Sequence, residues 1–484
     1  MQIGIIPVIP LSFAVFIPLF VRRRRLVAVY SAVATFITLV STIWMFHASF
    51  SSAFPMVYTF GGWRAPFGIV FEVDRLSAVL ALTAAFGFFL ISIYSSAFLS
   101  KNEGSGYFHI FLLGLEAGVL GAFMTGDAFN LFVMLEAIGA AAYGIVGFYR
   151  SRGDSMEAAF KYGISGAMAT SLYFLALGFV YASYGTLNMA DLSREFHASG
   201  TVQGLAAFFA LTIAMVVVKS AIFPGHYWLP DAYQGAPVPA VAILSGFVEV
   251  VGIYVLARYE FTVFSGSATL SLVFLTLGAA TAFLGSVMML FQTDLKRMVA
   301  YSTILHMGYL MMTLGVASRL ALEAVAFHIV NHAIAKMLLL LTLGSFVYVA
   351  GSSRLDELAG MGRRMPATTF LFGLATMSLV GVPPLNVFFS KMLIYDALMQ
   401  KSPALAFVVV ITSVIAAWAY VRVLVALWRG RGRNAEERLG GEKPAFLIIN
   451  SVLAVLVVAL GILAPLLLGH VFGPAATQAM DWRR

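Results

Sequence analysis

Residues 214–224 read Ala-Met-Val-Val-Val-Lys-Ser-Ala-Ile-Phe-Pro, and this stretch decides the fold class. Lys219 lies inside an apolar run, which is interrupted at Pro224-Gly225 and then resumes. An ammonium group at membrane depth is costly, and such residues usually mark an ion pathway. A lysine just before an interrupted helix is typical of transporters. The stretch therefore predicts a broken transmembrane helix with a functional lysine.

A second stretch repeats this arrangement further along the chain. Residues 381–391 read Gly-Val-Pro-Pro-Leu-Asn-Val-Phe-Phe-Ser-Lys, which places Lys391 beside a break at Pro383-Pro384. Two lysines beside two breaks indicate two related halves, because transporter folds are often built from internal repeats.

The composition supports a membrane protein. Of the 484 residues, 61% are hydrophobic and only 11% are charged, and the mean hydropathy is +0.92. A soluble protein carries about 25% charged residues. The sequence contains no cysteine, so any redox centre that drives this protein would lie on another chain. The net charge of +8 lies mostly in short loops, which indicates a role in topology and not in nucleic-acid binding.

About twenty apolar residues span the hydrocarbon core, and on this basis the sequence predicts an all-α polytopic protein with fourteen spans. The two longest, 320–350 and 366–398, are expected to be tilted or broken, and the seventh is expected to continue through Trp228 toward Ala232. The predicted spans are 3–20, 26–48, 76–99, 108–125, 128–149, 157–184, 204–222, 238–258, 267–291, 299–316, 320–350, 366–398, 404–428 and 445–470.

The charged loops orient the bundle. The first apolar run ends in Arg22-Arg23-Arg24-Arg25 and lacks a basic start and a cleavage site, so we expect a retained span. Lys and Arg are concentrated in the loops on the same side, including the segment from Arg429 to Lys443. Positive loops face the cytoplasm. The sequence therefore predicts a protein of the inner (plasma) membrane with both termini on the non-cytoplasmic side.

Several other ionisable residues fall inside apolar spans. His328, His332 and Lys336 are spaced i, i+4 and i+8, which places them on one helical face. Such a line suits a proton relay, since histidine titrates near neutral pH, although a lone buried histidine is more often structural. Glu323, the nearest carboxylate on that helix, falls on another face, so we expect no metal site. Auxiliary positions, each with a conduction role or a structural one, are Glu116, His226, Glu249 and His306.

Lys219 requires a partner, because a nearby carboxylate would stabilise its charged form. Glu136, in Phe-Val-Met-Leu-Glu-Ala, is the natural choice. If the pair can separate, the lysine can take up and release a proton. The alternative is a static ion pair, which would contribute little to stability.

Five motifs resemble the proton-conducting, antiporter-like membrane family. This family includes Mrp-type sodium/proton antiporter subunits, the proton-pumping subunits of respiratory complex I, and the matching subunits of membrane-bound hydrogenases. The resemblance covers roughly residues 70–400, and the segment Gly61–Ile69 is most similar to the Mrp D-type subunit. The other four motifs are Thr125–Glu136, Phe223–Asp231, Asp294–Ile304 and Asn331–Lys336.

The resemblance implies two inverted five-helix repeats, each with one broken helix. The implied divisions are 1–107 for helices 1–3, 108–260 and 261–430 for the two repeats, and 431–484 for a cytoplasmic loop and the last helix. It also implies that Glu136 and Lys219 match the helix-5 glutamate and the helix-7 lysine. Lys391 then matches the terminal residue of helix 12, and the His328–Lys336 face matches the link on helix 11.

One position departs from the family. A lysine commonly precedes Val-Gly-(Ile/Val)-Tyr on helix 8, but here that place is Val250, with Glu249 before it. Water, Glu249 or the helix-11 histidines would then bridge the two halves, or conduction would be altered.

The leading functional prediction is a proton-translocating subunit of a multisubunit membrane complex, an ion carrier and not an enzyme, without cofactor. A partner chain would supply the driving step, either sodium exchange in a Mrp-type antiporter or redox chemistry in a hydrogenase or dehydrogenase. A stand-alone secondary transporter for an organic solute, or a non-conducting scaffold, are the alternatives from other classes.

Overall fold

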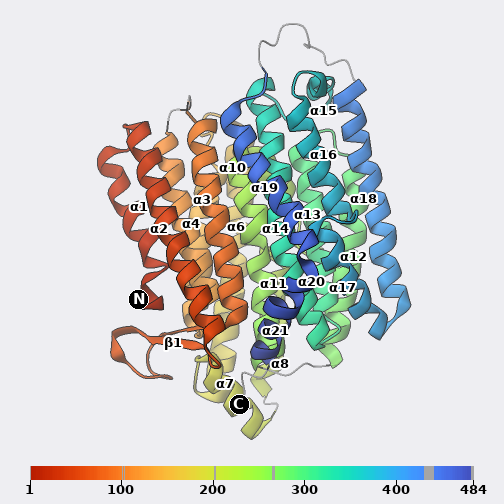
Figure 1. Ribbon diagram of the computed structural model, residues 1–484. Helices are drawn as coiled ribbons and strands as arrows, with labels where there is room; N and C mark the ends of the chain where they lie inside the picture. Colours follow the sequence, from red (N-terminus) through yellow and green to blue (C-terminus); the bar gives the residue numbers. More distant parts are fainter. Residues whose placement is uncertain are drawn as a thin grey trace.

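The computed structural model describes residues 2–480 except 101, 103, 201–202, 264–267 and 430–440. Most helices run side by side along one common direction (Figure 1). The α-helices are α1 Val8–Phe16, α2 Arg24–Ser51, α3 Arg75–Phe98, α4 Ser105–Met124, α5 Ala128–Val146, α6 Gly153–Tyr184, α7 Met189–Ser199, α8 Gln203–Lys219, α9 Leu229–Gly235, α10 Val238–Ile243, α11 Glu249–Ala257, α12 Ala268–Leu290, α13 Leu295–Leu314, α14 Arg319–Ala350, α15 Leu355–Leu358, α16 Pro366–Val380, α17 Asn386–Lys401, α18 Pro403–Arg429, α19 Pro444–Ile462, α20 Ala464–Leu467 and α21 Gly473–Met480.

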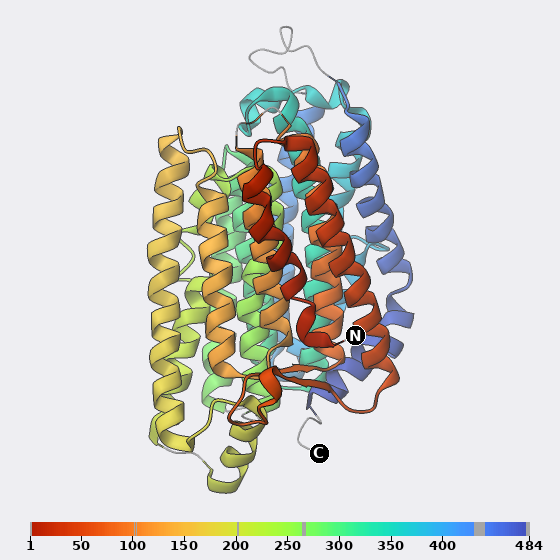
Figure 2. The same ribbon diagram turned by 90° about the vertical axis from the view of Figure 1, so that its left-hand side faces the viewer.

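Smaller elements complete the chain. Strands β1 (Met56–Thr59) and β2 (Val70–Val73) form an antiparallel hairpin between α2 and α3, with Met56 opposite Val73. The hairpin lies at the lower end of the bundle, and α7 projects below it (Figure 2). The Gly61–Ile69 motif forms the connection between the two strands. The 3₁₀-helices are Ile3–Ile5, Ile17–Phe20, Phe60–Gly62 and Met361–Arg363, and the π-helical turns are Leu244–Val248, Arg258–Val263 and Leu468–Phe472.

All fourteen predicted spans correspond to helices. Among the described residues, eleven helical stretches are long and apolar enough to cross a membrane. The other three predicted spans correspond to α8, to α13 and to the pair α16 and α17. Helices α8 and α16 are shorter because the chain breaks at their ends, and α13 begins with charged side chains, Lys296 and Arg297. The protein is therefore an all-α, multi-pass membrane protein.

Both predicted breaks are present. Helix α8 ends at Lys219, and the chain resumes as a helix at Leu229. The second break separates α16 from α17, where Gly381 has a φ of +94° that favours glycine. A Cβ at Gly381 would lie 3.0 Å from Cδ of Lys391, so the glycine also leaves room for the lysine stem. The expected break in 366–398 is confirmed, whereas 320–350 forms one continuous helix, α14.

Two other predicted spans are less regular than expected. The span 238–258 is not one α-helix: π-helical turns precede and follow α11. The prediction of one helix over 445–470 is wrong. Helix α19 ends at Ile462, and the short α20 and a π-helical turn follow, because Pro465 cannot continue the hydrogen bonds of α19.

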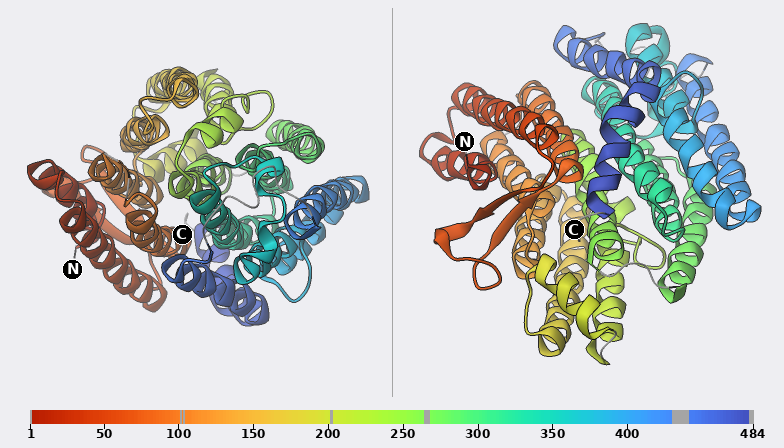
Figure 3. Two further views of the ribbon diagram at one scale, coloured as in Figure 1. Left: turned by 90° about the horizontal axis from the view of Figure 1, so that it is seen from above. Right: turned by 60° about the horizontal axis from the view of Figure 1, so that its bottom comes forward.

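Seen along the helix axes, α1 and α2 lie at one side of the molecule and α18 at the opposite side, with α13 and α14 between them (Figure 3). The helical stretch Val238–Val263 is wholly buried in the interior. Helix α14 packs against α16, α17 and α19 in the second half and against α3 and α10 in the first. The two broken helices are thus connected through the most buried helices of the bundle.

A buried ion pair joins α3 to the end of the buried stretch Val238–Val263. Arg258 donates from Nη1 and Nη2 to the two carboxylate oxygens of Asp74, at 2.5 and 2.7 Å. Asp74 also caps α3, because Oδ1 accepts from the backbone N–H of Ser77 at 2.7 Å. Arg258 donates further from Nε to the hydroxyl of Tyr254, at 2.8 Å. This network therefore holds Asp74, the extended residue that precedes α3, against the core.

We expect Asp74→Asn to destabilise the fold strongly. Asparagine keeps the helix cap but leaves the Arg258 charge buried without a counter-ion, which costs about 3 kcal/mol or more. The measurement is the thermal unfolding midpoint of the purified chain in detergent. The matched control is Asp154→Asn, since Asp154 pairs with Arg152 at the surface with both side chains half-exposed. Equal midpoints for the two variants would contradict this account.

Candidate functional site: a buried polar axis

Four lysines are buried among the described residues. Lys296, in the first turn of α13, donates to the carbonyls of Gln234 and Ala236, and the other three lie beside the two breaks and in the middle of α14. Lys219, Lys336 and Lys391 are 7%, 0% and 2% exposed. They come from the end of α8, the middle of α14 and the second turn of α17, respectively. A buried ammonium must be hydrogen-bonded or paired to be stable, so the partners of each lysine define the site.

Lys219 contacts a tyrosine and not the predicted glutamate. Its Nζ donates to the hydroxyl of Tyr143 at 3.3 Å and lies 5.8 Å from the centre of that ring. No ion pair within 4.0 Å joins Lys219 to Glu136 in the described part of the chain. Glu136 is exposed on α5, although it lies within the range of electrostatic interaction with Lys219. The predicted direct contact is therefore replaced by an interaction through space, with Tyr143 next to the lysine.

Two glycines leave the space that the side chain of Tyr143 occupies. A Cβ at Gly166 of α6 would lie 1.9 Å from the Tyr143 hydroxyl, and one at Gly139 would lie 2.8 Å from it. The ring of Tyr143 packs edge-on against Tyr162, with centroids 4.8 Å apart. Tyr162 in turn stacks on Trp228, which follows the break. Tyr143 was not among the residues predicted from the sequence, although its spacing of seven residues from Glu136 places both on one side of α5.

We expect Tyr143→Phe to slow ion translocation about tenfold. Phenylalanine keeps the ring contacts but removes the hydrogen bond to a charged group, which is worth about 1.5 kcal/mol or more. The measurement is the rate of proton flux in vesicles that contain the assembled complex. Tyr181→Phe is the matched control, because Tyr181 is exposed on the neighbouring helix α6. An unchanged rate in Tyr143→Phe would exclude a role for the hydroxyl.

Glu249 lies at the centre of the polar axis, the series of buried polar side chains from Lys219 through Lys336 to Lys391. Its side chain is fully buried, and Oε1 lies 3.3 Å from the hydroxyl of Tyr233. That hydroxyl lies 3.4 Å from Oγ1 of Thr303, which is hydrogen-bonded to Ser245 at 2.9 Å. Glu249 also lies within electrostatic range of Lys336. The carboxylate therefore faces a hydroxyl network between α9, the π-helical turn before α11, and α13.

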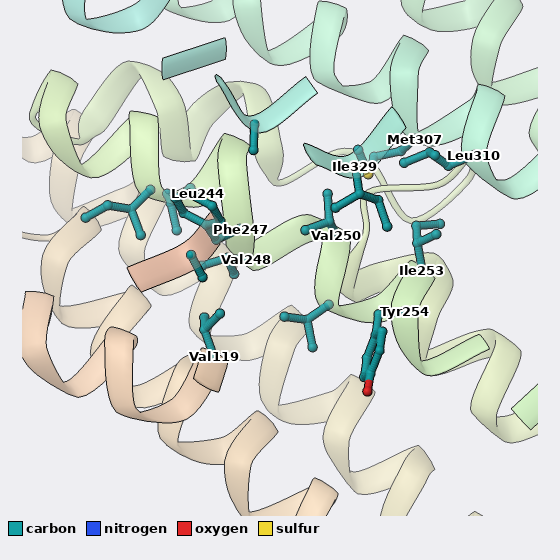
Figure 4. Packing of buried hydrophobic residues seen from close by; sticks show 14 of the residues in the cluster. Val119, Leu244, Phe247, Val248, Val250, Ile253, Tyr254, Met307, Leu310 and Ile329 are labelled. Atoms are coloured by element: carbon teal, nitrogen blue, oxygen red, sulfur yellow. The ribbon is translucent and has the colours of Figure 1, made fainter. Parts of the chain in front are cut away.

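Val250, which stands where the family commonly has lysine, is part of the apolar core. It is fully buried, and Figure 4 shows it next to Ile329 of α14 among other apolar side chains. The backbone carbonyl of Glu249 accepts a hydrogen bond from Ser220 at 2.6 Å, directly beside Lys219. The polar side chain at this part of α11 is therefore Glu249, one residue before the usual lysine position.

Lys336 is held by α13. Its Nζ donates to Oγ of Ser302 at 2.7 Å and to the carbonyl of Val299 at 3.2 Å. Ser302 is also hydrogen-bonded to the hydroxyl of Tyr420 on α18, at 2.5 Å. These contacts connect the centre of α14 with the second half of the chain.

Three histidines lie beside Lys336. Nδ1 of His306 is 3.0 Å from Nε2 of His328, and Nδ1 of His328 is 3.0 Å from Oγ of Ser390. The ring centre of His332 is 5.0 Å from that of His306, and neither of its buried nitrogens has a hydrogen-bond partner within the described structure. His306 points into the bundle as predicted. The histidines thus lead from Lys336 toward α17, where Ser390 directly precedes Lys391.

Lys391 uses groups that the second break makes available. Its Nζ donates to the carbonyl of Val380, the last residue of α16, at 2.9 Å, and to Oγ of Ser413 at 2.9 Å. Ser413 is 3.1 Å from the hydroxyl of Tyr309, and that ring lies 5.3 Å from the lysine nitrogen. Lys219 and Lys391 therefore each have an aromatic ring and a hydroxyl close by, but no ion pair within 4.0 Å among the described residues.

Two auxiliary positions lie apart from this axis. His226 is half-buried in the connection that follows the first break. Glu116 is buried on α4 and makes no hydrogen bond or ion pair with the described axis residues. In the part of the chain that the structure describes, no three His, Cys, Asp or Glu side chains are close enough together to hold a metal ion.

Residues 125–416, which contain the whole axis, match the family described as NADH:quinone oxidoreductase/Mrp antiporter, TM. The chain belongs to this family. Relatives within it have different roles. The chain is 29% identical to the D-type subunit of the Na(+)/H(+) antiporter of Alkalihalophilus pseudofirmus, over 95% of this chain and 94% of the relative. It is 33% identical to the N-type subunit of the NADH-quinone oxidoreductase of Desulforudis audaxviator, over 89% and 88% of the two chains.

A solved structure has the same fold over almost the whole length. It is a chain of the membrane-bound sulfane sulfur reductase, an archaeal respiratory membrane complex. The TM-score is 0.92 at 28% identity, with 99% of each chain covered. The predicted resemblance to the antiporter-like family is thus confirmed.

Proposed function

We propose that this chain is a proton-translocating subunit of a multisubunit membrane complex and corresponds to the D-type subunit of a Mrp-type cation/proton antiporter. The observation that carries the proposal is the continuous series of buried polar side chains between the two helix breaks. The similarity to a D-type antiporter subunit over almost the whole chain supports the Mrp assignment. The chain itself then catalyses no chemical reaction, and the driving ion gradient is used by the complex.

The proposed path has three parts. Protons enter near the first break and reach Lys219, whose charge is controlled by Glu136 through space and by the hydrogen bond to Tyr143. They then move laterally past Glu249 and Lys336 and along the histidines. Release takes place from Lys391 at the second break. A path of single titratable groups suits protons better than an organic solute, which needs a pocket of several converging groups.

The exposure of Glu136 supports the presence of a partner subunit on this face of α5. Its side chain is exposed near the middle of α5, a helix that is otherwise apolar on that face. A carboxylate in contact with lipid at this depth is costly. A transmembrane helix of another subunit would cover Glu136 and give it a hydrogen-bond donor, so the free chain presents one face for assembly.

The proposed membrane topology of the chain follows from the distribution of positive charge. The chain lies in the plasma membrane with both termini on the non-cytoplasmic side, because the positive loops face the cytoplasm. Residues 108–260 and 261–430 form the two inverted repeats, each with one broken helix. Residues 1–107 and 431–484 flank them, of which 1, 101, 103, 431–440 and 481–484 lie outside the described residues.

A proton-pumping subunit of a redox-driven complex is the second candidate. The 33% identity to an N-type subunit of an NADH-quinone oxidoreductase and the fold shared with a sulfur reductase chain favour it. Both functions use the same axis and differ in the partner that drives it.

The test uses vesicles that contain the complex purified through a tag on this chain. After a pH gradient is imposed, added NaCl should dissipate it, as followed with a pH-sensitive dye, and KCl should have a smaller effect. Vesicles from cells that lack the chain are the control. Proton uptake that requires an electron donor and ignores sodium would replace the antiporter with the second candidate.

A further inference from the structure

A second pair of buried titratable side chains lies outside the axis, on α4. His109 is 2% exposed and Glu116 is 0% exposed. They are seven residues apart, which places them on one side of the helix about 10 Å apart along its length. The opposite side of α4 packs against α5, where a Cβ at Gly114 would lie 3.5 Å from Ala141. The pair therefore faces away from α5.

His109 shows what this side of α4 faces. Its Nδ1 is 3.0 Å from Oγ of Ser31 on α2, and its Nε2 is 3.5 Å from Oγ of Ser96 on α3. Ser31 is hydrogen-bonded in turn to Ser92 of α3 at 3.1 Å. We refer to His109, Ser31, Ser92 and Ser96 as the His109 cluster. It lies one turn inside the end of the bundle where Arg24 binds the carbonyl of Ser100.

Further buried hydroxyl groups on α2 lead from the His109 cluster to the level of Glu116. Helices α2 and α4 both start at this end of the bundle and pack against each other. Ser31 and Thr38 have the same seven-residue spacing as His109 and Glu116, so Thr38 lies at about the depth of Glu116. Thr35 and Thr38 are fully buried and donate to carbonyls of their own helix. Their oxygen lone pairs remain free to accept a proton donor.

The carboxyl group of Glu116 has no partner among the described residues. Neither oxygen accepts or donates a hydrogen bond within the described structure, and no ion pair reaches it. A buried ionised carboxylate without a partner would cost several kcal/mol or more, so the group must carry a proton. The other titratable groups of the elements packed against α4 are engaged elsewhere or lie on other faces. On α3 and α11 these are Arg75 with the carbonyl of Ser52, Tyr94 with the carbonyl of Leu341, Tyr254 with the carbonyl of Phe123, Glu249 with Tyr233, and Arg258, which follows α11, with Asp74. On the other elements they are Arg24 with the carbonyl of Ser100, Arg25 and His47 exposed on α2, Tyr30 beside Phe13, Glu136 and Tyr143 on α5, and Glu72 beside Gly126 at the far end.

We infer that Glu116 is a second proton-binding site of this chain, reached from the α2–α4 end of the bundle through the His109 cluster. The site takes one proton on the carboxyl group, and the imidazole and hydroxyl groups exchange it with water. It adds a site to the proposed function but differs from the axis in its helices and its entrance.

The test is infrared spectroscopy of the full chain in lipid vesicles during transfer from H2O to D2O. The spectrum of wild type minus Glu116→Gln should contain one carboxylic acid C=O band, and this band should shift within seconds in D2O. His109→Leu should keep the band and slow its shift at least tenfold. If that variant fails to fold, as judged by its thermal unfolding, His109→Gln replaces it. His47→Leu, an exposed histidine at the other end of α2, is the matched control.

Two results would overturn the inference. One is the absence of a difference band, because Glu116 then carries no proton. The other is a shift in the His109 variant as fast as in wild type, because the cluster is then only a packing seam between helices. The spectrum requires no ion gradient. A chain that fails the sodium test can therefore still show the infrared band, and a chain that passes the sodium test can lack it.

Discussion

Lys219→Ala is expected to abolish proton translocation while the complex still assembles. The lysine ends α8 at the first break, and its charged nitrogen makes one hydrogen bond among the described residues, to Tyr143. It has no ion pair within 4.0 Å in the same part of the chain, so its loss leaves no buried counter-charge. A positioned proton carrier contributes about a hundredfold or more to a transfer rate, and alanine provides no replacement group.

The measurement is proton flux in vesicles together with the yield of the assembled complex. Lys401→Ala is the matched control, since Lys401 is exposed at the end of α17. We expect normal flux and normal assembly for this control. A flux near the wild-type rate in an assembled Lys219→Ala complex would remove Lys219 from the path and leave the break as a structural feature.

Much of the fold could be predicted because the signals are local. A long apolar run is sufficient to predict a membrane helix, and Pro224 and Pro383-Pro384 interrupt two such runs. The depth of Lys219 and Lys391 followed directly. The break after Ile462 also has a local signal, Pro465, which the hydropathy of the surrounding residues concealed. The π-helical turns around α11 have no such signal: neither proline nor a charged residue marks Leu244–Val248.

The partners in the site could not be predicted in the same way. Ser302, Ser390 and Ser413 are ordinary residues in sequence, and their role depends on contacts between helices far apart in the chain. The direct Glu136–Lys219 pair was the simplest expectation from charge, but Glu136 is exposed, and Tyr143, two turns further along the same side of α5, contacts the lysine. Charge selects possible partners, whereas the position of a side chain along its helix decides which of them makes contact.

At the centre of the axis, the rotation of α11 decides which side chain faces the polar network. Helix α11 starts directly after a π-helical turn, and such a turn changes the angular position of the residues that follow it. In this structure Val250 faces Ile329 (Figure 4), and Glu249 faces Tyr233. A carboxylate can therefore serve where the family commonly has an ammonium group.

Glu249→Gln is consequently expected to lower proton flux about a hundredfold. Glutamine keeps the size of the side chain and can still accept from Tyr233, so the fold should persist, but an amide cannot carry a proton between Lys219 and Lys336. Glu249→Asp should retain part of the rate, because the carboxyl group remains but is one methylene shorter. The measurement is flux in vesicles, corrected for the amount of assembled complex.

The matched control is Glu157→Gln, since Glu157 is exposed and pairs with Lys161 at the surface, where ion pairs are worth little. If Glu249→Gln and the control both translocate protons at the wild-type rate, the histidines of α13 and α14 must receive protons by another way. The hydroxyls of Ser245 and Thr303, which are hydrogen-bonded to each other beside Glu249, would then be the groups to replace next. Loss of flux in Glu249→Gln alone would instead place the carboxylate between the two halves, because no other acidic side chain occupies this network among the described residues.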